Sequence, residues 1–147
     1  MYTVSRSALV THSAEKMFNL VNDVDGYSEF LPWCGDSREV ERTNNEVVAS
    51  VTIDFKGIRK TFTTRNTLQP YKRTDLALVD GPFSELSGFW EFQELGSDSC
   101  KVVLNLDFDF SNKLVGAVVG PIFSSIADSM VGSFCSRADD VYGVHTI

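Results

Sequence analysis

The spacing of apolar residues divides the chain into segments with different periods. Over residues 2–10, apolar and polar side chains alternate, which is the pattern of a strand with one buried face. Ser13 can cap a helix, and the apolar positions over residues 14–22 then follow a helical period. A second short helical turn is predicted over residues 27–31. The start of the chain therefore predicts one strand and two small helices.

From residue 36 to residue 111 the apolar positions recur at every second residue. Turn signals divide this segment into six predicted strands, and they lie at residues 43–45, 56–57, 69–71, 80–82 and 96–98. Such short connections favour an antiparallel meander. In the fifth of these strands Gly88 falls in the apolar row, where it predicts a bend or a bulge.

The chain closes with a predicted long helix. Placed at about 100° per residue, the apolar side chains of residues 121–142 fall within one arc of roughly 180°. Pro121 suits the first turn of a helix, so residues 113–119 are expected to form a short helical lead-in that is kinked against the main helix. Gly143 then supplies the stop. The main helix spans about 33 Å, which is enough to cross a whole sheet.

These elements predict an α+β domain with a helix-grip architecture. A seven-stranded antiparallel sheet with one apolar face must cover that face, and the long C-terminal helix is the element that can do so. The curved sheet should wrap around this helix and leave an elongated internal cavity beside the two small helices. We expect one domain over residues 1–143 and a short tail over residues 144–147.

Composition and charge narrow the setting. The chain has 147 residues and a formal net charge of −7, which disfavours broad binding to nucleic acid or to anionic membranes by long-range attraction, and no DNA partner is expected. No apolar run approaches the roughly 18 residues of a membrane-spanning helix, and the start of the chain does not resemble a signal peptide. Cys34, Cys100 and Cys135 have no paired spacing, so we expect free thiols, no metal site and a cytoplasmic protein.

One stretch departs from this acidic balance. Between Phe55 and Thr74 the chain carries six basic residues and no acidic one. On an outer face of the sheet they could contact the phosphates of RNA or of phospholipid head groups, or they could be ordinary solvated side chains. The candidates for a surface toward an anionic partner are Lys56, Arg59, Lys60, Arg65, Lys72 and Arg73.

The order of elements and several short motifs resemble a known family. The motifs are Pro32-Trp33-Cys34, Asp80-Gly81-Pro82-Phe83, Phe108-Asp109-Phe110-Ser111, Arg137-Ala138 and Tyr142-Gly143. Together they resemble the coenzyme Q-binding branch of the START-like, helix-grip superfamily, which is related to the polyketide cyclases. Within that branch the chain is most similar to the bacterial ribosome association toxins.

This resemblance implies a non-enzymatic binding protein with a hydrophobic cavity for ubiquinone or a related lipid, and no other cofactor. In the toxin branch it also implies interference with ribosomal subunit joining, with the large subunit as partner. The inner face of the membrane is a further implied partner, through a transient contact. Two alternatives stay open, namely a polyketide cyclase or aromatase-like enzyme, and a quinone chaperone for respiration without a ribosome role.

The candidate cavity residues are the side chains that alternation and helical phase direct inward. Trp33 lies in an apolar connection and is expected at the mouth, where it can act as a lid over ligand or as a plug in a closed core. The full set is Phe30, Trp33, Phe62, Leu86, Trp90, Phe92, Leu104, Phe108, Ile126, Met130, Phe134 and Arg137.

Arg137 is the one charged residue well inside the apolar arc of the C-terminal helix. Its guanidinium can reach water and complement the C-terminal end of the helix dipole. Alternatively, it can form a polar end of the cavity and donate a hydrogen bond to a quinone carbonyl or a lipid phosphate. The sequence alone leaves both interpretations open.

Catalytic residues are not expected. His12 and His145 have no obvious triad partners, and Cys34 has no adjacent activating base. Asp107 and Asp109 share a strand face, but the alternation directs both toward solvent. A binding protein is therefore favoured over an enzyme.

Overall fold

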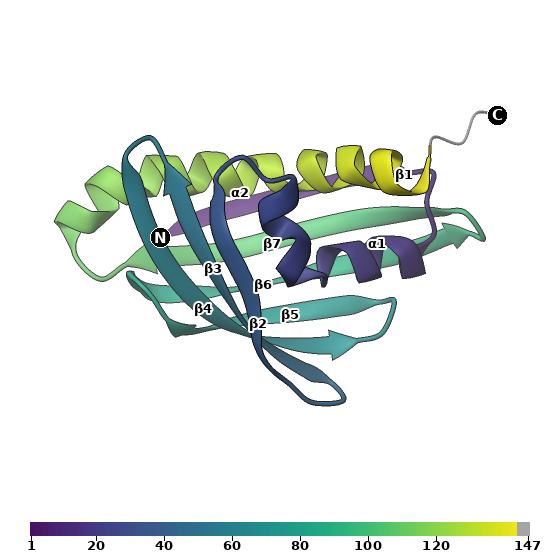
Figure 1. The fold of residues 1–147 in the computed structure, drawn as a ribbon, viewed down its shortest axis with the longest axis horizontal. Helices are drawn as coiled ribbons and strands as arrows, with labels where there is room; N and C mark the ends of the chain where they lie inside the picture. The colour runs from purple at the N-terminus through teal and green to yellow at the C-terminus, as the bar shows by residue number, and fades with distance from the viewer. Residues whose placement is uncertain (144–147) are drawn as a thin grey trace.

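The computed structural model describes residues 1–143, so the predicted tail and His145 lie outside the described residues (Figure 1). The elements are, in chain order, β1 (Tyr2–Val10), α1 (Ala14–Val21), η1 (Val24–Glu29), β2 (Cys34–Arg42), β3 (Glu46–Phe55), β4 (Ile58–Gln69), β5 (Arg73–Asp80), β6 (Phe83–Gly96), β7 (Ser99–Phe110) and α2 (Lys113–Tyr142).

The strands form one antiparallel sheet of seven in the order β1-β7-β6-β5-β4-β3-β2. Strands β2 to β7 pair with their neighbours in sequence, whereas β1 pairs with β7 and forms one edge. The sheet curves beside α2, which runs along the long axis of the molecule in Figure 1 and packs against β1 and β7. The predicted helix-grip fold is thereby confirmed.

Helix α1 is held at both ends by side-chain hydrogen bonds. Ser13 accepts a hydrogen bond from the Lys16 backbone N–H at 3.2 Å, as its capping position predicts. At the other end, the Asn22 amide donates to the hydroxyl of Thr74 on β5 at 3.0 Å. Because Thr74 is almost completely buried, this bond fixes α1 on the inner side of the sheet.

The second small helix differs from its prediction. It is a 3₁₀-helix that begins at Val24, upstream of the turn predicted over residues 27–31. The Gly26 N–H donates to the Asp23 carbonyl at 3.1 Å, which is the i to i+3 spacing of a 3₁₀ turn. Apolar periodicity could not distinguish these alternatives over so few residues.

Helix α2 runs without a break from Lys113 to Tyr142, so the predicted lead-in and the main helix form one element with Pro121 inside it. Pro121 faces solvent, while the preceding Gly120 is buried against β1. A Cβ added at Gly120 would lie 2.8 Å from the Tyr2 hydroxyl oxygen. This close contact holds the first turns of α2 on the sheet, so the helix passes through Pro121 although proline cannot donate the usual hydrogen bond. Gly143 ends the helix with a φ of 83°, as predicted.

Gly88 is needed for close strand packing. The predicted bulge is wrong, because the register between β6 and β7 is unbroken on both sides of the Gly88–Leu106 pair. A Cβ added at Gly88 would lie 2.0 Å from the Asn105 carbonyl oxygen. Any side chain here would therefore push β7 away from β6.

Aromatic rings fill one end of the space between the sheet and α2. Phe123 of α2 packs edge-on against Phe83 of β6 and Phe108 of β7, with ring centroids 4.9 and 4.8 Å apart. Tyr2 of β1 stacks on Phe108 from the edge strand at 5.2 Å. This cluster fills the space between the sheet and the first turns of α2. Any cavity must therefore lie nearer the middle of the helix.

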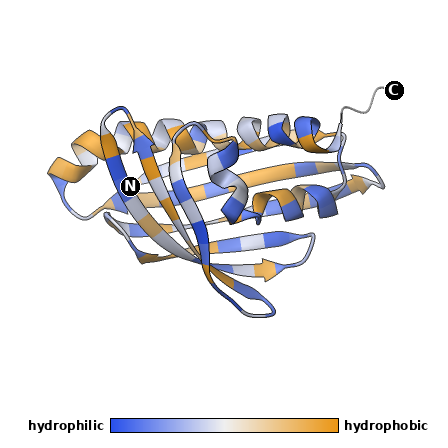
Figure 2. Cartoon of the chain, in the orientation of Figure 1, coloured by the Kyte–Doolittle hydropathy of each residue, from blue (hydrophilic) through white to orange (hydrophobic). Residues whose placement is uncertain are grey.

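The start of α2 is apolar and exposed. Leu114 and Val118 are 76% and 49% exposed, and Figure 2 shows a run of hydrophobic residues at this end of the helix. Among residues 1–143, α2 is the one helix whose length and composition would allow it to cross a membrane, and 33% of its most apolar window is buried. Its later turns belong to the domain core.

Candidate ligand cavity

A cavity of about 80 Å³ lies between the inner face of the sheet, η1 and the middle of α2. Its lining is carbon-rich, with a few polar groups on β4 and near the mouth. The lining residues are Val24, Tyr27, Trp33, Ala49, Val51, Phe62, Thr64, Asn66, Leu76, Leu86, Trp90, Leu106, Phe123, Ile126 and Met130.

Six of the twelve predicted cavity residues lie in this wall, namely Trp33, Phe62, Leu86, Trp90, Ile126 and Met130. Four others, Phe92, Leu104, Phe108 and Phe134, are buried in the core outside the lining. Phe134 shows the reason, because the rings of Tyr27, Phe30 and Trp90 surround it at 5.3 to 5.4 Å. A side chain that points inward is predicted to be buried. Whether it also borders a void depends on how closely neighbouring rings pack around it.

Arg137 does not line the cavity. Its guanidinium nitrogen Nη2 lies 3.2 Å from the Glu29 carboxylate, and its Cζ lies 5.0 Å from the centre of the Phe30 ring. The side chain is 28% exposed. Helical phase places Arg137 on the arc that faces the domain, but at this end of α2 the neighbour is η1. The guanidinium therefore reaches the surface, and Phe30 lies beneath it.

The mouth segment, residues 30–33, joins η1 to β2 and closes the cavity with Trp33. The Trp33 carbonyl accepts a hydrogen bond from the Asp54 N–H at 2.8 Å, which fixes the segment to β3. Trp33 is buried, with 5% of its surface exposed. The buried indole N–H has no hydrogen-bond partner among residues 1–143.

Two polar side chains of β4 also face the cavity. Thr64 and Asn66 lie two residues apart, so they share a strand face with Phe62. The Thr64 hydroxyl donates to the Asn66 carboxamide oxygen at 2.7 Å. The alternation that places Phe62 inward also places these two positions inward. They were not predicted as cavity residues because their side chains are polar.

Tyr27 contributes a ring to the wall while its hydroxyl is engaged elsewhere. The hydroxyl donates to the carbonyl of Val21, at the end of α1. Burial raises the pKa of Tyr27 above its ordinary value, and the charge of Asp23 acts in the same direction. Tyr27 is thus a neutral hydrogen-bond donor that ties η1 to α1.

Comparison with known proteins agrees with this arrangement. Residues 10–135 match the family described as polyketide cyclase / dehydrase and lipid transport. The chain belongs to this family.

Relatives of this family member carry two kinds of name. The ribosome association toxin RatA of Vibrio cholerae is 50% identical over 97% of this chain and 99% of its own length. The mitochondrial coenzyme Q-binding protein of Schizosaccharomyces pombe is 29% identical over 90% of this chain and 84% of its own length. The Zhui aromatase/cyclase from Streptomyces sp. R1128 shares the fold with a TM-score of 0.79 and 20% identity, covering 98% of this chain and 99% of its own.

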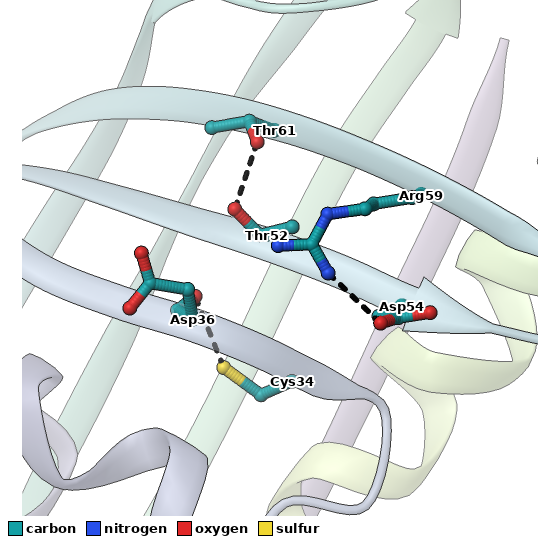
Figure 3. A network of polar contacts seen from close by, with 6 residues as sticks. All are labelled: Cys34, Asp36, Thr52, Asp54, Arg59 and Thr61. Atoms are coloured by element: carbon teal, nitrogen blue, oxygen red, sulfur yellow. Dashed lines mark hydrogen bonds and ion pairs between the residues drawn. The ribbon is translucent and has the colours of Figure 1, made fainter.

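On the outer surface of this family member, folding brings carboxylates beside the cationic stretch. Figure 3 shows Arg59 paired with Asp54, at 2.8 Å. Arg65 pairs with Glu46 at 3.2 Å. Arg73 lies 2.9 Å from Asp75 and 3.7 Å from Glu91. The three arginines are thus neutralised by residues outside the stretch. Among residues 1–143, Lys56, Lys60 and Lys72 form no ion pair, and a contact of these lysines with an anionic partner stays a prediction.

The same view shows two further hydrogen bonds, one between β3 and β4 and one within β2. The hydroxyls of Thr52 and Thr61 share a hydrogen bond of 2.7 Å between β3 and β4. The Cys34 thiol donates to the Asp36 carbonyl at 3.3 Å within β2. Burial raises the pKa of Cys34, so this thiol is neutral and is a poor nucleophile at neutral pH.

His12 is buried at the junction of β1 and α1, away from the cavity lining. Its Nε2 lies 2.7 Å from a carboxylate oxygen of Asp139 on α2. The pair fastens the end of α2 to the start of the chain. Within residues 1–143, no group of three or more His, Cys, Asp and Glu side chains is placed to hold a metal ion.

Proposed function

We propose that this family member is a non-enzymatic protein that binds ubiquinone or a related isoprenoid lipid in the cavity between the sheet and α2. The carbon-rich wall is the observation that carries this proposal. Burying apolar ligand surface against it would contribute roughly 25 cal/mol of favourable binding free energy for each Å² removed from water. The coenzyme Q-binding name of one relative supports the same ligand class.

Binding requires the cavity to enlarge. Its volume of about 80 Å³ is well below the roughly 300–1,000 Å³ of typical small-molecule sites. Two wall residues are suited to move. Met130 is flexible and only partly buried, and Trp33 belongs to a short connection at the mouth. We therefore expect a ligand to enter by displacing the mouth segment, with Met130 moving to make room for it.

A cavity-filling substitution tests this function. Ala49→Leu adds carbon to the wall at a position where the void can accept it, whereas Ala77→Leu adds the same carbon on the exposed face of β5. We expect the wild-type protein and Ala77→Leu to take up a short-tail ubiquinone at micromolar concentration, seen by quenching of Trp33 and Trp90 fluorescence. Ala49→Leu should remain folded and lose most of this binding.

Mass spectrometry of solvent extracts from the purified protein provides an independent measurement. The proposal fails if no quinone or lipid co-purifies or can be loaded and the tryptophan fluorescence of the wild-type protein does not respond to titration. Equal binding by Ala49→Leu and wild type would place any bound lipid outside this cavity.

We infer a second function, interference with ribosomal subunit joining, from the toxin relative at 50% identity. The large subunit is the proposed partner, and Lys56, Lys60 and Lys72 are the candidate contacts with its RNA. Glutamate at all three positions should abolish any inhibition of joining between purified ribosomal subunits, measured by sedimentation. Arg59→Glu with Asp54→Arg preserves the ion pair in reverse and serves as the control.

Liposome binding measured on the same variants separates two anionic partners. Loss of joining inhibition alone supports the ribosome as partner, and loss of liposome binding alone supports delivery to a membrane. If the wild-type protein leaves subunit joining unaffected, the ribosome function is rejected.

A cyclase-like enzyme remains the alternative that the shared fold suggests, although 20% identity to the Streptomyces cyclase carries the fold alone. The described cavity lining has no carboxylate, histidine, lysine or thiol for proton transfer. This composition favours binding over catalysis. Conversion of a poly-β-ketone substrate by the purified protein would favour the enzyme instead.

A further inference from the structure

The cavity wall includes two buried polar side chains of β4, which an apolar ligand alone would not require. Thr64 and Asn66 are only 8% and 7% exposed, and both border the cavity. The Thr64 hydroxyl donates to the Asn66 carboxamide oxygen at 2.7 Å. The Asn66 amide nitrogen takes no part in that bond, and an amide nitrogen can only donate.

Trp33 supplies a second donor in the same wall. Its indole N–H is buried, and it donates to no group among residues 1–143. A buried donor without a partner is unfavourable and rare in folded proteins. An indole nitrogen, like the amide nitrogen of Asn66, has no capacity to accept a hydrogen bond.

Tyr27 also borders the cavity, but its hydroxyl proton is already donated to the Val21 carbonyl, so toward a ligand its oxygen could only accept. We propose that Asn66 and Trp33 donate hydrogen bonds to a carbonyl oxygen on the head group of the ligand. This inference rests on the proposed function and specifies which chemistry the cavity selects. The ligand class is an apolar molecule with a ring-borne carbonyl, such as a quinone in its oxidised form.

A preference for the oxidised form follows from the two donors. A quinone carbonyl oxygen has two lone pairs and can accept from both Asn66 and Trp33, whereas a quinol hydroxyl must also direct its own proton to an acceptor.

Three probes separate head-group recognition from burial of the tail. They are decylubiquinone, its quinol, and decylbenzene, which has a ring and the same tail but no oxygen. We expect wild-type protein to bind the quinone about tenfold more tightly than the quinol, consistent with one well-formed hydrogen bond. Binding of decylbenzene reports the apolar wall alone.

Two substitutions remove one donor each. Asn66→Leu keeps a similar side-chain volume, and Trp33→Phe keeps an aromatic ring at the mouth. Each should weaken quinone binding about tenfold and change decylbenzene binding by much less than that. Thr61→Val is the matched control, because it removes a threonine hydrogen bond of 2.7 Å from the outer face of the same strand. Thermal unfolding verifies that each variant is folded.

Three results would overturn the inference. If quinone and quinol bind equally to wild type, or if the substitutions weaken quinone and decylbenzene in parallel, lipid binding stands but carbonyl recognition does not. If wild type binds none of the three probes, both the inference and the proposed function are wrong. Because Trp33→Phe and Asn66→Leu lie on different elements, misfolding of one leaves the other as a test.

Discussion

Arg137 Nη2 lies 3.2 Å from Glu29 Oε2, and this contact joins the last turns of α2 to η1. The guanidinium also lies over the Phe30 ring, at 5.0 Å from its centre. Phe30 is the first residue of the mouth segment that ends at Trp33. The contact between Arg137 and Glu29 is therefore placed to fasten the mouth from outside.

Replacing Arg137 by Met should accelerate ligand exchange. A partly exposed ion pair contributes roughly 0–1 kcal/mol, so the free energy of unfolding should fall by no more than about 1 kcal/mol. Because the pair fastens the mouth segment, we expect quinone dissociation to be severalfold faster in stopped-flow fluorescence. Glu29→Gln should give a similar change, since it removes the same pair from the other side.

The same substitution tests the alternative that Arg137 touches the ligand. A loss of affinity of about tenfold for decylubiquinone, with decylbenzene unaffected, would indicate a hydrogen bond from the guanidinium to the head group. That result would contradict the position of Arg137 outside the cavity.

Acid should weaken the attachment of β1 to α2. Arg6 Nε donates to Asp128 at 2.7 Å, and this hydrogen bond, with the charge of Arg6, lowers the pKa of Asp128. An aspartate whose pKa is lower in the folded state contributes stability above its unfolded pKa of about 3.9 and loses it as pH falls through the folded pKa. The melting temperature should therefore drop below about pH 4.

Asp109 should add to this acid sensitivity, because the Phe110 N–H and the N-terminal ammonium lower its pKa in the same way. Asp128→Asn and Arg6→Gln should each flatten the dependence of the melting temperature on pH between about 4 and 2. A slope identical to that of wild type in both variants would show that Asp128 does not contribute.

Two glycine substitutions should have opposite effects on stability. Gly88→Ala forces a Cβ to within 2.0 Å of the Asn105 carbonyl oxygen, so we expect a loss of about 3 kcal/mol or more. Gly132 lies inside α2 with no heavy atom within 4 Å of an added Cβ, and Gly132→Ala should stabilise the protein by about 0.5–1 kcal/mol. Urea unfolding measures both changes. A stable Gly88→Ala protein would contradict the close approach of β6 and β7.

The cysteines should react slowly in the native protein. Burial raises the pKa of Cys100 to about 11 and also raises the pKa values of Cys34 and Cys135. Alkylation requires the thiolate, so native protein at pH 8 should be modified slowly and unfolded protein quickly. Mass spectrometry should show Cys135, which is half-buried, modified before Cys100. Rapid modification of Cys34 would instead report frequent opening of the neighbouring mouth.

The fold could be predicted from the sequence because its signals are local. The alternation along β7 and the apolar arc of α2 each depend on residues within one element. The unbroken course of α2 through Pro121 could not be predicted, since the contact beside it comes from Tyr2, far away in sequence. Local chemistry identifies a weak point in a helix, but distant packing decides whether the helix continues there.

The candidate site was harder to predict because it depends on what surrounds each side chain. Phe134 and Met130 lie on the same arc of α2, yet rings enclose Phe134 and leave Met130 at the void. Arg59 belongs to a cationic run, but the neighbouring strand supplies Asp54 as its counter-ion. Asn66 was not predicted to line the cavity. The signal that could have identified it was a polar side chain at an inward-facing position of a strand.

The pairing of the first strand with the last one has a consequence for synthesis of the chain. Strands β2 to β6 can pair with a neighbour soon after each is made, whereas Tyr2 must wait for Phe108. Until then the backbone of β1 has no strand with which to pair. Such non-local pairing slows folding and leaves an unpaired edge that can aggregate. We therefore expect the domain to complete folding only after β7 has left the ribosome, with β1 joining the sheet among the last elements.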